Sequence, residues 1–383
     1  MEKEKYFRNR QEKIFQWLRE HDVFAAIFSD DEDLRDVSIR YFTGHPADAT
    51  LILTRDGNSI LIPWDEILAS KMAMAVDKIY PLTKFERKRS LALKSILGEL
   101  TSSKKQKIQI SPKTSHLDYC ELKNELSDFE LECISSGVHE YAVNMRAVKD
   151  DYEIECTRKA CSITDEMTQE IYSMVTSGKI RTETDVALYA EKMLREKGCE
   201  KTSFDTLAAG PDRSFAIHAF PGYTNGPWGT TGLSILDYGV CYEGYASDCT
   251  ITIARGPLSK EQEQLLDLVQ NAKDECLKLY VPGEKICRAV QKADEIFACA
   301  GKFMPHGLGH GTGLEIHEAP FVSKKSGSEK TFEPGNIITL EPGLYDAKLG
   351  GVRLENDVLI TENGRSEERR VGKECRSRWS PYH

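Results

Sequence analysis

The chain changes its pattern of apolar and polar residues near residue 135. Before that point, short apolar runs alternate with stretches of helical periodicity. The pattern predicts helices at residues 4–21, 64–76, 91–100 and 117–126, and strands at residues 23–28, 39–43, 50–54, 59–63, 78–81 and 107–110. An Asp-Gly pair at residues 56–57, between two apolar runs, is typical of a hairpin turn. This alternation predicts a small α/β domain over residues 1–135.

The second part of the chain, residues 138–364, repeats one order of elements. Helical periodicity at residues 151–175 and 186–197 recurs at residues 260–280 and 285–300, and a glycine follows each of these helices. Each helix pair precedes a stretch that carries glycine and histidine, and then β-rich runs. We expect two similar halves with a ligand site between them, because ligand sites favour such interfaces.

The last nineteen residues, 365–383, break this pattern. They read RSEERRVGKECRSRWSPYH, with six basic and three acidic residues and no apolar periodicity. The string resembles the translation of a common DNA-sequencing adapter along its whole length, and the alternative interpretation is a basic binding tail. We treat residues 365–383 as a non-native tail, exclude them from the fold, and expect a short natural C-terminal segment to be missing.

Composition narrows the class of protein. The formal net charge of −10 argues against a nucleic-acid partner, since such proteins normally present a basic face. No apolar run is long enough to span a membrane, and the charged N-terminus has no signal-peptide pattern. The eleven cysteines show no metal-finger spacing and are expected to be reduced thiols of a cytoplasmic protein.

Residues 305–320 concentrate candidate chemistry. They read PHGLGHGTGLEIHEAP and contain three of the nine histidines: His306, His310 and His317. So many glycines exclude a stable helix and predict a loop, followed by a short strand at residues 314–317. A single histidine is more often a structural residue than a ligand. Three in one glycine-rich stretch point to a metal or catalytic site.

A β-hairpin over residues 234–256 carries two aspartates within apolar runs. If the turn is centred between Tyr242 and Glu243, Asp237 lies directly opposite Asp248 on one face. Two carboxylates so placed repel each other. They require either a cation or a shared proton between them.

A second hairpin over residues 336–361 repeats this arrangement. A turn centred on Lys348 places Glu341 opposite Glu355. Four carboxylates and an imidazole can hold two divalent metal ions. A ligand set rich in oxygen and without thiolate favours Mn²⁺, with Co²⁺ or Zn²⁺ as alternatives.

These motifs together resemble the pita-bread metallopeptidases, which include aminopeptidase P, prolidase, creatinase and methionine aminopeptidase. The resemblance rests on SFDTLAAGPDRSFAIHAFPG, ILDYG, SDCTIT, HGLGHGTGLEIHEAP, ITLEPGLY and GGVRLENDVLIT, and covers residues 145–364. It implies an α+β fold: a pita-bread catalytic domain with a pseudo-twofold repeat, preceded by a smaller creatinase-type N-terminal domain. That N-terminal domain favours the Xaa-Pro peptidases and a homodimer.

Residue by residue, the resemblance implies five metal ligands: Asp237, Asp248, His310, Glu341 and Glu355. It implies catalytic roles for His218, for His317 as a stabiliser of the tetrahedral intermediate, and for Glu341 as a proton shuttle. His306 and Arg353 match positions near the substrate pocket; Arg353 could equally form a salt bridge to a ligand carboxylate. Ile217 stands where the family usually has proline before His218.

The implied activity is hydrolysis of an Xaa-Pro peptide bond by a hydroxide that bridges two metal ions. The substrate is a proline-containing peptide, and the sequence leaves aminopeptidase and dipeptidase activity open. Two rival hypotheses are a creatinase-like hydrolase that works without metal and a non-catalytic binding protein on the same fold. Both predict the loss of metal ligands, whereas all five are present here.

Overall fold

The computed structural model describes residues 2–367, which divide into two units between Met145 and Arg146. The predicted boundary lay near residues 135–137, whereas helix α6 (Val138–Met145) belongs to the first unit. Of the predicted tail, residues 365–367 belong to strand β19 (Gly364–Glu367), and residues 368–383 lie outside the described residues. No helix in the described part of the chain is both long enough and apolar enough to span a bilayer.

The first unit is a six-stranded mixed sheet with helices, in the strand order β4-β3-β2-β1-β5-β6. Strands β1 and β5 run parallel, whereas β1, β2 and β3 form an antiparallel meander through the predicted Asp-Gly turn. The elements are α1 (Glu2–Glu20), β1 (Ala25–Asp30), α2 (Ser38–Thr43), β2 (Ala49–Thr54), β3 (Ser59–Pro63), α3 (Glu66–Met72), β4 (Lys78–Ile79), the 3-10 helix η1 (Leu82–Phe85), α4 (Arg89–Leu100), β5 (Lys107–Ile110), α5 (His116–Glu125), β6 (Glu130–Glu132) and α6.

One prediction in this unit is wrong: residues 39–43 form helix α2 and not a strand. Gly44 ends the helix with a positive φ of 70°. Two side chains of α1 satisfy carbonyl groups at this end, because Arg10 donates to Tyr41 O and Gln11 donates to Phe42 O, each at 2.8 Å. A short buried apolar run does not distinguish helix from strand, and these tertiary hydrogen bonds decide it.

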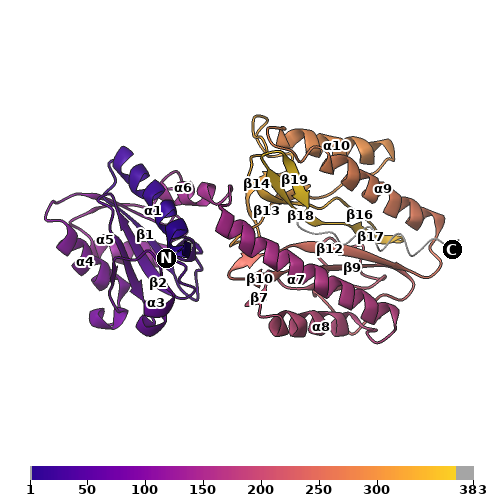
Figure 1. Ribbon diagram of the computed structural model, residues 1–383, viewed down its shortest axis with the longest axis horizontal. Helices are drawn as coiled ribbons and strands as arrows, with labels where there is room; N and C mark the ends of the chain where they lie inside the picture. The colour runs from indigo at the N-terminus through magenta and orange to yellow at the C-terminus, as the bar shows by residue number, and fades with distance from the viewer. Residues whose placement is uncertain (1, 368–383) are drawn as a thin grey trace. The chain divides into compact units, whose positions relative to one another are not determined.

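The second unit contains the two predicted helix pairs. They are α7 (Asp151–Thr176) with α8 (Glu183–Glu196), and α9 (Lys260–Leu277) with α10 (Ile286–Cys299). Helices α7, α8 and α9 each begin with a reciprocal capping box, in which the N-cap side chain and the third helical residue bond each other's backbone N–H. Figure 1 shows α8 along one edge of this unit and α9 and α10 along the opposite edge, with strands between them.

The strands of this unit form small antiparallel sheets in two groups. The first group, β12-β9-β8 and β11-β10-β7, follows the first helix pair; the second, β14-β13-β15-β18-β19 and β16-β17, follows the second pair. The strands are β7 (Lys201–Thr202), β8 (Leu207–Ala209), β9 (Gly232–Tyr238), β10 (Val240–Tyr242), β11 (Tyr245–Ala246), β12 (Cys249–Arg255), β13 (Gly309–Gly311), β14 (Glu318–Val322), β15 (Ile337–Leu340), β16 (Gly343–Asp346), β17 (Gly350–Arg353), β18 (Asn356–Thr361) and β19.

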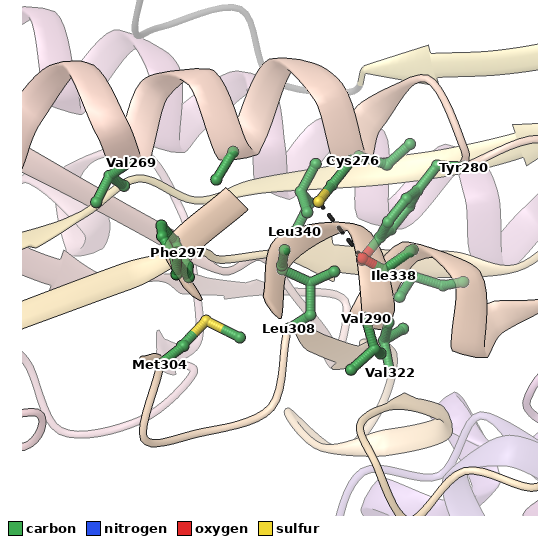
Figure 2. Close-up of a cluster of buried hydrophobic side chains, with 14 of the residues drawn as sticks. Val269, Cys276, Tyr280, Val290, Phe297, Met304, Leu308, Val322, Ile338 and Leu340 are labelled. Atoms are coloured by element: carbon green, nitrogen blue, oxygen red, sulfur yellow. Dashed lines mark hydrogen bonds between the residues drawn. The ribbon is translucent and has the colours of Figure 1, made fainter. Parts of the chain in front are cut away.

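Each half has its own hydrophobic core between its helices and strands. The second-half core joins α9 and α10 to Leu308 and to strands β14, β15, β16, β17 and β18. Figure 2 shows Leu308 and Leu340 within it, close to side chains of α9 and α10 such as Cys276 and Val290. Leu308 directly precedes β13, and Leu340 directly precedes Glu341, so burial of these leucines fixes the strand ends that carry candidate site residues.

Candidate metal centre

The glycine-rich stretch forms strand β13, which lies between β14 and β15. A Cβ on Gly309 would lie 2.0 Å from the carbonyl oxygen of Thr339, and one on Gly311 would lie 2.3 Å from that of Ala319. The glycines therefore allow neighbouring backbones to approach closely. The predicted strand at residues 314–317 is wrong, because residues 313–317 form a bend and the strand lies at residues 309–311. Residues 305–308 and 312–317 form no helix or strand, in agreement with the predicted loop.

His310 lies in β13, and neighbours of both ring nitrogens fix the orientation of its imidazole. Its Nδ1 is 3.1 Å from the carbonyl oxygen of Gly311, which can only accept, so Nδ1 carries the hydrogen. The lone pair of Nε2 then faces two carboxylates, 3.5 Å from Asp248 and 3.7 Å from Glu341. Burial lowers the pKa of His310 to about 4, with the neighbouring His317 as a further cause. A neutral imidazole presenting Nε2 is the form that binds a metal ion.

The first hairpin places its aspartates on one face, but in a different register from the predicted one. Asp237 pairs with Thr250, so the predicted pairing with Asp248 is wrong. The turn is centred one residue later than expected, because Glu243 and Gly244 adopt positive φ angles of 47° and 85°. A turn displaced by one residue moves the cross-strand partner by two, and side chains two apart share a face. Asp237 and Asp248 therefore remain diagonal neighbours.

The second hairpin has the predicted register. Gly343 pairs with Arg353 in the β16–β17 ladder, and Leu340 pairs with Asn356 in the β15–β18 ladder. Both pairings are centred on Lys348, so they belong to one hairpin. Glu341 and Glu355 therefore face each other between the two ladders. The predicted opposition of these two glutamates is confirmed.

Three of the five predicted ligands form a compact group. Ligand atoms of Asp248, His310 and Glu355 all lie within 4.8 Å of one another. Glu341 is joined to them through its 3.7 Å contact with His310. Asp237 belongs to the same cavity, and its charge raises the pKa of Glu355. The structure thus brings together all five residues from strand ends that are far apart in the sequence.

The electrostatics of this cluster are unfavourable without a cation. Burial, followed by repulsion from Glu355, raises the pKa values of Asp248 and Glu341 well above their usual range. Burial and then Asp237 raise the pKa of Glu355 to about 8. Oδ1 of Asp237 is buried without a hydrogen-bond partner among the described residues. Divalent cations would remove the repulsion and satisfy this oxygen, so the residues fit a metal centre.

Arg353 aligns two of the carboxylates. Its guanidinium donates from Nη2 to Asp237 Oδ2 at 2.5 Å and from Nε to Thr250 Oγ1 at 3.0 Å. Thr250 in turn donates to Glu355 Oε2 at 2.6 Å. Nη1 donates to Ile217 O and to the hydroxyl of Tyr345. Both positions considered for Arg353 occur together, because it forms the salt bridge to Asp237 and also lines the cavity.

Two residues of this surrounding network escaped the sequence analysis. Tyr345 links Arg353 to His306 Nε2, which lies 2.9 Å from its hydroxyl oxygen. Asp357 is fully buried behind Asp248. Both belong to the motifs ITLEPGLY and GGVRLENDVLIT. The alternation of residues along these strands places Tyr345 and Asp357 among the strand residues. The sequence does not show their partners, so it did not distinguish them from ordinary strand residues.

The remaining predicted residues line a cavity of about 440 Å³ together with the carboxylates: His218, His306, His317 and Arg353. Its size is that of a small-ligand site. The rings of His310 and His317 have centroids 4.3 Å apart. Burial lowers the pKa of His306 to about 4 and also lowers the pKa of His317. The imidazoles of His306 and His317 are therefore neutral near pH 7 and can donate a hydrogen bond without carrying charge.

Two helix pairs enclosing strands, with buried acids and a histidine at the strand ends, define a metal-dependent hydrolase of the pita-bread fold. Residues 155–362 match the model of metallopeptidase family M24, and the chain belongs to this family. The expected α+β architecture, with a smaller domain ahead of the catalytic one, is confirmed, as is the expectation of a peptidase. The family implies divalent metal ions, in agreement with the buried acid and histidine cluster.

Named relatives cover nearly the whole chain. An Xaa-Pro dipeptidase from Pyrococcus furiosus is 30% identical over 360 residues, covering 93% of this chain and 96% of the relative. The crystal structure of the prolidase from Pyrococcus horikoshii OT3 superimposes with a TM-score of 0.79 at 26% identity, covering 95% of this chain and 99% of that one. An X-Pro aminopeptidase from Thermotoga maritima shares the fold, with a TM-score of 0.80 at 24% identity over 94% of this chain and 98% of that one.

Proposed function

We propose that this protein hydrolyses the peptide bond between an N-terminal residue and a following proline, with two divalent metal ions. The observation that carries the proposal is the cluster of Asp248, His310 and Glu355, with Asp237 and Glu341 beside it in one cavity. The full-length similarity to an Xaa-Pro dipeptidase supports the proline specificity. A cluster with four carboxylates and no thiolate favours Mn²⁺.

The metal ions would be held by Asp237, Asp248, His310, Glu341 and Glu355. When bound, they would activate a water molecule and polarise the scissile carbonyl group. Arg353 fixes the orientation of Asp237 directly and that of Glu355 through Thr250. Such outer hydrogen bonds hold ligands in the geometry that a metal requires.

The proton transfer is assigned to Glu341. Proline follows the scissile bond, so the leaving nitrogen belongs to a tertiary amide without N–H and needs a proton as the bond breaks. The carboxylate of Glu341 takes a proton from the attacking water and delivers it to that nitrogen. The assignment rests on the position of Glu341, whose carboxylate lines the cavity beside His310.

The three histidines outside the ligand set bind and orient the substrate. His317 lies against His310 and donates an N–H to the carbonyl oxygen as negative charge develops there. His218 lines the same cavity and contacts the peptide backbone. His306 is fixed by Tyr345 and lies 3.8 Å from Glu341, where it borders the substrate.

The decisive experiment combines metal analysis with a matched pair of peptides. Protein stripped by chelation and reloaded with Mn²⁺, Co²⁺ or Zn²⁺ should cleave Leu-Pro-Ala, and Leu-Ala-Ala should be a poor substrate. Full activity in rigorously metal-free protein would contradict the proposal and favour a creatinase-like mechanism. His116→Ala, an exposed histidine of α5, is the control variant that should keep both metal and turnover.

Four further expectations accompany this proposal. We propose a homodimer, to be tested by light scattering, and a protein without affinity for nucleic acid, as its net charge of −10 suggests. We also propose a cytoplasmic location, since the described cysteines form no disulfide. Residues 1–135 would then serve as a creatinase-type domain and residues 138–364 as the catalytic domain.

A further inference from the structure

Among the described residues the cavity contains no lysine, and its one arginine is already bonded to neighbouring groups. Arg353 is the one Lys or Arg that lines it within the part of the chain that the structure describes. Its side chain is 3% exposed, and four N–H groups already donate to Asp237, Thr250, Tyr345 and Ile217 O. A guanidinium has five such groups. One N–H group is left, so a two-point contact with a substrate carboxylate would require Arg353 to release one of these partners.

A negative charge stands at the rim of the same cavity. Asp205 lines it, is exposed, and has no hydrogen-bond or ion-pair partner among residues 2–367. It follows Phe204 and comes just before β8, outside the cluster of candidate metal ligands. A free carboxylate on a substrate would meet this charge, which no lysine or arginine among the described residues neutralises. Like charges at such a position disfavour binding, and salt weakens the effect because the position is exposed.

Beside the cavity the surface is apolar and aromatic. Ile217 and His218, which line the cavity, lie in a segment whose Phe215 and Phe220 are 43% and 96% exposed. The segment is anchored, because Ala208 donates to Gly222 O at 2.9 Å and Arg213 bonds both Glu183 and Pro221 O. Fixed, exposed aromatic rings suit contact with a peptide that continues past the cavity.

We propose that the substrates are Xaa-Pro peptides that continue beyond the proline, and that free Xaa-Pro dipeptides are disfavoured. The inference rests on the proposed function and specifies the substrate class of the same site. In a dipeptide the proline carries a free carboxylate beside the scissile bond, where Arg353 is engaged and Asp205 repels. In a longer peptide that carboxylate is replaced by an amide, and the following residues reach Phe220.

A substrate series separates charge from length. The Mn²⁺-loaded full chain would be assayed with Leu-Pro, Leu-Pro-amide, Leu-Pro-Ala and a pentapeptide beginning with Leu-Pro. We expect kcat/KM for the amide to exceed that for the dipeptide by about tenfold, equivalent to about 1.4 kcal/mol. Raising the ionic strength should reduce this ratio. Binding of the same compounds to the His317→Ala variant, measured by calorimetry, should give the same order while turnover is strongly reduced.

Two variants test the assigned residues. Asp205→Asn should raise kcat/KM for the dipeptide and so reduce the ratio of kcat/KM between the amide and the dipeptide. Asp56→Asn, in the β2–β3 turn, is a matched control. Phe220→Ala should weaken the pentapeptide more than the amide. A dipeptide cleaved as well as its amide at low salt would overturn this inference alone. Failure to cleave every Xaa-Pro compound would overturn the proposed function and this inference with it.

Discussion

The backbone N–H of Asp248 donates to the side chain of Asp357 at 2.9 Å, which places one buried acid behind another. Oδ2 of Asp357 also accepts from the thiol of Cys161, and Oδ1 accepts from the hydroxyl of Thr312. An ionised carboxylate accepts hydrogen bonds and donates none, so the carboxylate of Asp357 suits the three donors around it. Asp357 therefore fixes the segment that leads from Asp248 into β12.

Asp357→Asn should lower metal affinity while the protein remains folded. The side-chain amide of asparagine would point its own N–H groups toward the donors that Asp357 accepts from. We expect this mismatch to cost about 1–3 kcal/mol of stability. Loss of an outer hydrogen bond to a ligand typically reduces metal affinity about 10–100-fold. Metal titration by calorimetry and urea denaturation would measure both effects. Unchanged affinity would show that Asp357 supports only the fold.

The two histidines of the glycine-rich stretch should respond differently to substitution. His310→Ala should lower metal content, because it removes the only nitrogen in the proposed ligand set. His317→Ala should retain metal and lose turnover, by about 2.7–4 kcal/mol in activation free energy if it donates to the oxyanion. Metal analysis and kcat on Leu-Pro-Ala would be measured for both. Loss of metal in His317→Ala with retention in His310→Ala would reverse the assignment.

Metal-free protein should lose stability as the pH rises from 6.5 to about 8. Glu355 has a pKa of about 8 in the fold, and Asp248 and Glu341 are also raised, so the folded state holds protons that the unfolded chain releases. Between pH 4.5 and 6.5 the lowered pKa values of His306 and His310 act in the opposite direction. Thermal melts of chelated protein should show the decline above pH 6.5. Metal-loaded protein should not.

Arg146 forms a buried ion network with Glu318, which directly follows His317. Its Nε lies 2.9 Å from Glu318 Oε1, and Lys149 lies 3.4 Å from the other oxygen. Arg146→Met should destabilise the protein by about 3–5 kcal/mol, because it leaves an incompletely paired buried charge. Turnover should fall while metal is retained, since Glu318 also accepts from the backbone N–H of Glu315 in the bend before His317.

Urea denaturation of Arg146→Met would be compared with Lys192→Met. Lys192 forms a surface ion pair with Glu196 on α8, and loss of such pairs costs less than about 1 kcal/mol. Similar destabilisation in the two variants would contradict the structural role of the buried network.

Removal of residues 368–383 should leave the melting temperature and turnover unchanged if that segment derives from an adapter. Removal of residues 365–383 should lower the melting temperature, because β19 pairs with β18 through Arg365 with Ile360 and Ser366 with Leu359. Strand β18 begins directly after Glu355. Loss of β19, which pairs with β18, should therefore also disturb the position of Glu355. A large loss of stability on the shorter deletion would indicate that the segment is native structure.

The sequence by itself determined the elements whose local patterns agree with their long-range contacts. Helices α7, α8 and α9 begin at capping residues such as Thr182 and Ser259, and α8 ends just before Gly198, which has a positive φ. The opposition of Glu341 and Glu355 followed from the turn at Lys348, because a hairpin register is local. The five candidate ligands were identified by motif and spacing.

Tertiary structure decided what local pattern leaves ambiguous. Helix α2 replaced a predicted strand because Arg10 and Gln11 of α1 bond its carbonyl groups. The glycine stretch became strand β13 because two neighbouring backbones approach too closely for any Cβ, which no pattern along the chain records. The role of Arg353 depended on partners at positions 217, 237, 250 and 345, brought together only by folding. Contacts between segments distant in the sequence contribute the free energy that favours one local structure over another, and a local pattern does not record them.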